Sequence, residues 1–232
     1  MAQFDIVDGP TKRTTTPYVT GTSVVAIRYK DGILLASDTL GSYGSLARYR
    51  QVSRLHALGD VLVGGSGDLS DFQNIIQDLE ALRTTEYCHG DGVYLSARET
   101  WSYLSRRLYQ RRNKMDPLWN QLVVAGFRDN KPFLGLVDLH GTNYEDVTIA
   151  TGYGGHLARP LLRNAIDQYG PQMTKEQALQ VVTDAMKVLF YRDCRTINRI
   201  QFATVTAEGV DIQPAVELET YWEFEKFVKA DH

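Results

Sequence analysis

The 232-residue sequence has little of several features that mark particular classes of protein. It has no apolar run near the ~20 residues that a membrane-spanning helix needs, and its N-terminal part lacks the apolar stretch of a signal peptide. Cysteine occurs only at Cys88 and Cys194, and without an export signal these favour free thiols over a disulfide. We therefore expect a chain that is not exported and that is stabilised by a packed core.

The sequence also lacks a surplus of charge of either sign. Its 25 basic and 28 acidic side chains give a net charge of -3, so a broad nucleic-acid-binding surface is not expected. The 5 histidines are scattered without the spacing of metal ligands, and no Walker loop or G-x-S-x-G turn occurs. We expect no metal, no cofactor, and neither a nucleic acid nor a membrane as partner.

Hydrophobic periodicity divides the chain into blocks of strands and paired helices. Strands are expected at 22–29, 33–37, 61–65, 121–127, 133–138, 147–151, 200–206 and 209–213. One pair of helices follows residue 68 and another follows residue 152, with capping boxes at Ser96–Glu99 and Thr174–Gln177. Because hairpin-linked strands form antiparallel sheets that paired helices can cover, this order predicts one α+β domain, a four-layer αββα sandwich.

Two further patterns each have more than one interpretation. Arg107 and Arg111 lie four residues apart in a basic run that ends at Lys114, which indicates either a solvated helix end or a protein contact. The glycine-rich stretch 152–155 precedes a helix, and it is either a tight strand-to-helix turn or a phosphate cradle made of backbone amides.

Several long segments resemble, in order along the chain, the β-type subunits of the eukaryotic 20S proteasome, which are N-terminal-nucleophile hydrolases. The similarity runs from about Thr14 to Gln213 and is densest in VTGTSVVAIRYKDGILLASDTLGSYGSLARYR, GSGDLSDF, NKMDPLWNQLVVAGF, ATGYGGHLARPLLR and LFYRDCRTINRIQFATVT. It implies the αββα fold of these hydrolases, with a leader over residues 1–21, a proteasome domain over 22–213 and a C-terminal arm over 214–232. Among β-type subunits, the chain is most similar to a non-catalytic ring member.

The resemblance also places retained residues at positions of the threonine-protease site. Thr22 falls at the nucleophile, while Asp38, Gly67 and Asp193 match a supporting aspartate, an oxyanion-facing glycine and a late aspartate. In such a site the threonine hydroxyl attacks and the freed α-amine, with a pKa near ~7.7–8.0, accepts the proton. Activity would therefore require cleavage between Gly21 and Thr22, because an internal threonine has only an amide nitrogen.

Other positions depart from the catalytic pattern. Arg54 replaces the essential lysine, and a planar guanidinium with a pKa above ~12 cannot take the place of a compact ammonium. Tyr153 replaces a serine that orients the free amine, and Thr196 replaces a later serine. These departures predict a subunit that is inactive by itself and is part of a threonine-type endopeptidase complex. The alternative is an active N-terminal threonine endopeptidase formed by cleavage at Gly21–Thr22.

The resemblance further implies processing and assembly features. Arg13 and Thr14 form a second candidate processing point. The C-terminal segment carries aromatic side chains suited to an interface, namely Tyr221, Trp222, Phe224 and Phe227. We expect contacts with β subunits of the same and the opposite ring and with α-ring subunits. The expected role is a structural one in ATP- and ubiquitin-dependent protein degradation, in the cytoplasm and nucleus.

Overall fold

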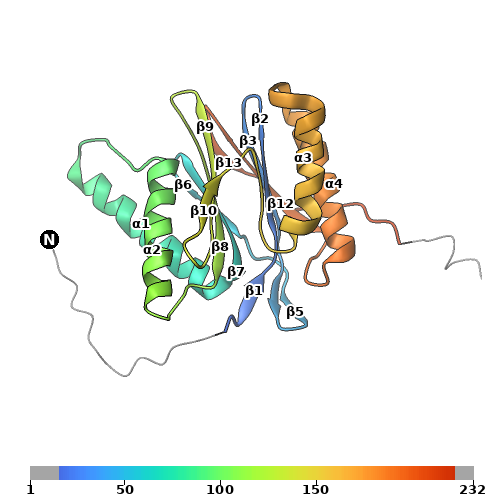
Figure 1. Cartoon of the computed structure of the whole chain (residues 1–232), viewed down its shortest axis with the longest axis horizontal. Coiled ribbons are helices and arrows are strands. Elements are labelled where there is room, and N and C mark those ends of the chain that lie inside the picture. The colour runs from blue at the N-terminus through green and yellow to red at the C-terminus, as the bar shows by residue number, and fades with distance from the viewer. Residues whose placement is uncertain (1–15, 223–232) are drawn as a thin grey trace, which may run out of the picture.

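The computed structural model describes residues 16–222, whose strands form two antiparallel sheets (Figure 1). The eight strands of the larger sheet are β1 (Val19–Gly21), β4 (Gly41–Tyr43), β5 (Leu46–Tyr49), β6 (Leu55–Leu58), β7 (Val61–Asp68), β8 (Asn120–Arg128), β9 (Lys131–Val137) and β10 (Asn143–Glu145). Their order is β10-β9-β8-β7-β1-β4-β5, and β6 also pairs with β7. The segment β1 is therefore an internal strand of this sheet.

The smaller sheet has six strands. They are β2 (Val24–Tyr29), β3 (Gly32–Asp38), β11 (Thr148–Ala150), β12 (Arg199–Thr206), β13 (Gly209–Ile212) and β14 (Val216–Glu217). Their order is β11-β2-β3-β12-β13, and β14 also pairs with β12. Because β1 belongs to the larger sheet and β2 to the smaller one, the chain crosses between the sheets at Thr22 and Ser23.

Two pairs of helices cover the outer faces of the sheets (Figure 1). The helices are α1 (Leu69–His89), α2 (Ala97–Asn113), α3 (Gly154–Tyr169) and α4 (Lys175–Arg192), with a short 3-10 turn, η1 (Gly170–Gln172), between the last two. The first pair packs on the larger sheet and the second pair on the smaller one. The predicted αββα sandwich is confirmed. Between residues 16 and 222, no helix is both long and apolar enough to span a membrane.

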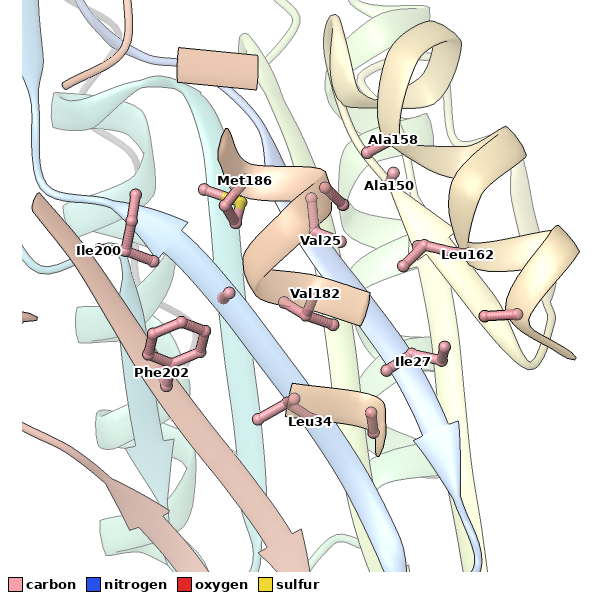
Figure 2. Close-up of a cluster of buried hydrophobic side chains, with 14 of the residues drawn as sticks. Val25, Ile27, Leu34, Ala150, Ala158, Leu162, Val182, Met186, Ile200 and Phe202 are labelled. Carbon is pink, nitrogen blue, oxygen red and sulfur yellow. The ribbon is translucent and has the colours of Figure 1, made fainter. Parts of the chain in front are cut away.

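Both faces of the central strands are buried, which explains their nearly continuous apolar sequences. In β2, Val24 and Ala26 pack between the two sheets, whereas Val25 and Ile27 face the helices. This follows from the two-residue period of a strand, which sends successive side chains to opposite faces. Figure 2 shows the core under α3 and α4, which includes Leu34, Ala158, Leu162, Val182, Met186, Ile200 and Phe202.

The predicted helix starts are confirmed by their caps. The Asp68 carboxylate accepts hydrogen bonds from the backbone amides of Ser70 and Asp71 at 2.8 and 3.0 Å, and so caps α1. The pairs Ser96–Glu99 and Thr174–Gln177 form complete capping boxes at α2 and α4. Each cap satisfies backbone N–H groups that have no partner within the helix.

The sheets extend beyond the predicted strands and beyond both predicted domain boundaries. The strand predicted at 61–65 continues to Asp68, and β1 and β14 lie outside the range 22–213. The strands β1, β4, β5, β6, β10 and β14 were not predicted, because a run of two to four residues is too short to show a period. Gly65 in β7 lacks a side chain because a Cβ there would collide with the Phe72 ring of α1.

The basic run on α2 is only partly solvated. Arg107 forms an ion pair with Asp78 of α1, and Arg111 pairs with Asp116 at 3.0 Å. These acidic partners neutralise much of the positive stripe that the sequence indicated. Arg107 therefore links α2 to α1, and Arg111 links α2 to the loop that follows it.

Candidate functional site

Thr22 lies where the chain leaves the larger sheet and enters the smaller one. Its Oγ1 donates a hydrogen bond to Oδ2 of Asp193 at 2.5 Å, and Asp193 Oδ1 accepts one from the backbone amide of Arg195 at 3.0 Å. Asp193 is buried at the C-terminal end of α4, 171 residues further along the chain. The Thr22 hydroxyl is therefore held by a direct hydrogen bond to this carboxyl group.

An open pocket of about 530 Å³ lies against Thr22. Four predicted site residues line it, namely Thr22, Gly67, Tyr153 and Asp193. Tyr153 is largely exposed, so its phenol ring lines the pocket and is not packed into the core. Cys194 also lines the pocket and, like Cys88, is a free and exposed thiol, as predicted.

Arg54 lies beneath Thr22, is fully buried, and uses all five of its N–H donors. Nη1 donates to the carbonyl oxygens of Thr22 at 2.7 Å and Gly65 at 3.1 Å. Nη2 donates to the carbonyl oxygen of Ser23 at 3.0 Å and to Oδ1 of Asp38, and Nε donates to the Asp38 carbonyl oxygen at 3.2 Å. Burial raises the pKa of the Asp38 carboxyl, and the Arg54 charge opposes that rise. The guanidinium thus joins the crossing between the sheets to β3 and β7.

This arrangement limits what the Thr22 hydroxyl can do. A guanidinium stays protonated and cannot accept a proton from a nucleophile. Each N–H of Arg54 is already bonded to a carbonyl group or to Asp38, so none reaches Thr22 Oγ1. The nitrogen of Thr22 is an amide while Gly21 is attached, and an amide nitrogen donates but does not accept. Neither group can activate the hydroxyl.

Two glycines of the site have steric reasons to be glycine. A Cβ on Gly21 would collide with the Arg54 side chain. Gly67 has φ +97, and a Cβ there would collide with the carbonyl oxygen of Trp119. The family resemblance implied that Gly21 precedes a cleavage site and that Gly67 faces an oxyanion. The fold requires both glycines independently of any chemistry.

The stretch 152–155 is the tight turn into α3. The Gly154 amide donates to Ser23 Oγ at 2.8 Å, and the Gly152 amide donates to Gln121 Oε1 at 2.9 Å. Because these amides bond within the protein, they are not free to cradle a phosphate. Sequence analysis did not identify Ser23 and Gln121, since their partners lie 131 and 31 residues away and no local pattern marks such pairs.

Thr196 is bonded to the end of α4, and its hydroxyl partners do not include Thr22. Its Oγ1 donates to the carbonyl oxygens of Leu189 at 3.2 Å and Asp193 at 3.0 Å, so it stabilises the end of α4. Asp38 and Arg54 form the buried pair under Thr22, and the structure thus brings all seven predicted site residues into one region. In the part of the chain that the structure describes, no group of three or more His, Cys, Asp or Glu side chains is arranged to hold a metal ion.

Of the predicted interface and processing residues, the structure describes Tyr221 and Trp222. Tyr221 and Trp222 are exposed, and the Trp222 ring contacts Phe190 and Tyr191 of α4 with centroids 5.6 and 5.1 Å away. The start of the C-terminal arm is thereby held on α4. The remaining predicted residues lie outside the described range, namely Arg13, Thr14, Phe224 and Phe227.

Comparison with known proteins finds proteasome subunits both among family models and among individual relatives. A family model described as "Proteasome subunit" matches residues 18–205. Proteasome subunit beta type-4 of Arabidopsis thaliana is 46% identical over 223 residues, covering 96% of this chain and 89% of that protein. The beta type-4 subunit of Dictyostelium discoideum is 49% identical, covering 92% and 82%. Proteasome subunit beta type-7 of Saccharomyces cerevisiae is 40% identical, covering 95% and 86%.

Proposed function

The chain belongs to the proteasome subunit family, and from this premise we propose that it is a non-catalytic β subunit of the 20S core particle. In this role it completes a β ring whose other members hydrolyse peptide bonds. The relatives that span most of its length carry the names beta type-4 and beta type-7, and these names support the β-seven ring position, which we propose for this chain. Loss of one member would prevent the ring from closing.

One observation carries the non-catalytic assignment: the saturated guanidinium of Arg54. Hydrolysis by a threonine needs a group that takes the hydroxyl proton and a positive charge near the nucleophile that is free to interact. Arg54 supplies neither, because all its donors are bonded to Asp38 and to backbone carbonyl oxygens. A misplacement of ~1 Å in such a site can lower the rate by about 100-fold. The site keeps its shape but not its chemistry.

The proposal extends to assembly and location. As a family member the chain assembles with other proteasome subunits, and we assign it contacts with β subunits of both rings and with the α ring. The exposed aromatic side chains of Tyr221 and Trp222 support an interface at the C-terminal arm. A particle of this kind acts in ATP- and ubiquitin-dependent degradation, which we place in the cytoplasm and nucleus.

Covalent labelling of the assembled particle tests the assignment. Purified particles are treated with an electrophilic boronate or epoxide probe, and each subunit is then analysed by mass spectrometry. The catalytic β subunits of the same particle serve as internal positive controls. We expect these to carry the adduct, while this chain carries none and retains residues upstream of Thr22.

The opposite result would establish the alternative. An adduct on Thr22, or a chain that begins at Thr22 as the main species, would identify an active N-terminal threonine endopeptidase. Such an enzyme would use the hydrogen bond between Thr22 Oγ1 and Asp193 and the open pocket beside Thr22.

A further inference from the structure

Aspartate followed by glycine is a dipeptide with a reactivity of its own. The side-chain carboxyl carbon of the aspartate lies close along the chain to the amide nitrogen of the next residue, and a glycine leaves that nitrogen unhindered. The sequence has this dipeptide at three positions, and the structure describes two of them, Asp31–Gly32 and Asp91–Gly92. These two dipeptides lie in opposite environments.

Asp91–Gly92 lies in the exposed loop that joins α1 to α2 at the periphery of the molecule (Figure 1). Gly92 has φ +71, and a Cβ at this residue would meet no atom within 4 Å. Asp91 Oδ1 accepts a hydrogen bond from the backbone amide of Val93 at 3.0 Å. This hydrogen bond closes a small ring that contains both the Asp91 carboxyl carbon and the Gly92 nitrogen. The two atoms that can react are therefore kept near each other, with open space around them.

The loop is fixed on either side of this dipeptide but not at its glycine. The Gly90 amide donates to the Tyr87 carbonyl oxygen at 3.1 Å, and the Leu95 amide donates to Glu86 Oε2 at 3.2 Å. Among residues 16–222, none forms a hydrogen bond with Gly92. Turning the Gly92 amide toward the preceding carboxyl group therefore breaks no hydrogen bond of this glycine.

Asp31–Gly32 is held in the sheet instead. Gly32 is buried, begins β3, and lies opposite Tyr29 of β2 on one side and Thr206 of β12 on the other. A Cβ at Gly32 would collide with the carbonyl oxygen of Val205. The main chain must rotate before the Gly32 nitrogen can face the Asp31 carboxyl carbon, and pairing with two strands opposes that rotation. The same dipeptide is therefore protected at this position.

We propose that Asp91 is a site of spontaneous isomerisation, at which the loop between α1 and α2 acquires an isoaspartyl linkage as the protein ages. The Gly92 nitrogen attacks the carbon of the protonated Asp91 carboxyl group. A C–N bond forms, the proton of the nitrogen and the hydroxyl group of the carboxyl leave as water, and a succinimide ring results. Water then opens this ring. Opening at the main-chain carbonyl carbon gives isoaspartate, opening at the side-chain carbonyl carbon restores aspartate, and no other reactant is needed.

The product presents a group that the original chain lacks. In isoaspartate the main chain runs through the side chain of residue 91 and gains one methylene group, while the α-carboxylate becomes free on the surface. A free α-carboxylate in this position is the substrate of carboxyl methyltransferases that act on isoaspartyl residues. The loop therefore becomes a methylation site for an enzyme of this class, independently of any chemistry at Thr22.

Ageing the protein in heavy-oxygen water tests the proposal. The full chain, in the assembly from which it is purified, is kept warm at neutral pH for several weeks and then digested. Chromatography separates isoaspartyl from aspartyl peptides, electron-transfer fragmentation identifies the residue, and heavy oxygen in the peptide reports passage through the succinimide. We expect isoaspartate with one heavy oxygen to accumulate at least about tenfold faster at Asp91 than at Asp31. A purified isoaspartyl-directed methyltransferase should label the aged chain and not the fresh one.

Two controls separate the effect of the fold from that of the sequence. In the chain unfolded in urea, neither dipeptide is protected, so Asp31 and Asp91 should isomerise at similar rates. Asp91→Glu requires a six-membered ring in place of the five-membered one and should abolish methylation at this loop. Equal rates at the two positions in the folded chain, or isoaspartate at Asp91 without heavy oxygen, would overturn the proposal. A tenfold difference that persists in urea would also overturn it, because the contrast would then come from neighbouring residues and not from the loop.

Discussion

Replacing the buried guanidinium should destabilise the fold far more than replacing an exposed one. Arg54 and Asp38 are both fully buried, and Arg54→Met would leave the Asp38 carboxylate without its counter-ion. Removing one partner of a buried ion pair costs about 3–5 kcal/mol. Four carbonyl groups would also lose a donor, although water entering the cavity would compensate part of that loss. We therefore expect a loss of about 4 kcal/mol, a large fraction of the stability of a typical domain.

A matched control and a double mutant separate the effect of the buried charge from that of the lost hydrogen bonds. Arg98 also contacts a carboxylate with both Nη atoms, at 2.5 and 2.8 Å from Glu145, but this pair is exposed. Arg98→Met should therefore cost less than about 1 kcal/mol. Adding Asp38→Asn to Arg54→Met removes the unpaired charge and should recover about 2 kcal/mol. Urea unfolding of the full chain, followed by tryptophan fluorescence, measures all four free energies.

The outcome can contradict the structural interpretation in two ways. If Arg54→Met costs no more than Arg98→Met, the buried guanidinium is not a cross-link between the sheets. If Asp38→Asn brings no recovery in the Arg54→Met chain, the cost comes from the carbonyl groups that lose their donors rather than from the buried charge.

Three further outcomes are expected. Gly21→Ala should cost about 2 kcal/mol in urea unfolding because its Cβ collides with the buried guanidinium, whereas Gly155→Ala, whose Cβ has room, should be nearly neutral. Hydrogen bonds from Ser96 lower the pKa of the Glu99 carboxyl in the folded chain. The capping box therefore stabilises the fold fully above the unfolded-state pKa of Glu99, and this contribution is lost as the pH falls through its folded-state pKa. Ser96→Ala should therefore destabilise the chain by about 1 kcal/mol near neutral pH and by less in acid; an equal loss at both pH values would contradict this. Deleting residues 220–232 should leave the domain folded but weaken the joining of half-particles, measured by native mass; normal assembly would refute an interface at the arm.

The layer order was predictable because its signals are local. Strands with two buried faces gave long apolar runs, and the starts of α2 and α4 carried complete capping boxes. Hairpin turns and paired helices then left few ways to arrange the layers. Resemblance to a family added the positions of the site residues, and the structure brings these together.

The contacts that decide function were not predictable from local pattern. Arg54 could be recognised as a substitution for lysine, but not as a residue with five bonded donors, because its acceptors lie on three separate parts of the chain. The strand β1 was missed for a related reason. Its three residues are too few to show a hydrophobic period. Its pairing depends on β4 and β7, which lie on either side of it in the folded sheet. Both features follow from the tertiary arrangement.

Under the non-catalytic assignment that we propose, the absence of catalysis and the cross-link between the sheets have the same physical origin at residue 54. A lysine ammonium has three donors, whereas the site presents five acceptors around Arg54, so an ammonium would leave at least two of them unbonded. The guanidinium satisfies all five and in doing so fixes the carbonyl groups of Thr22 and Ser23. Those hydrogen bonds hold the crossing between the two sheets at Thr22 and Ser23. The non-catalytic assignment that we propose follows from the same hydrogen bonds, because a guanidinium whose five donors are all occupied is not free to assist the Thr22 hydroxyl.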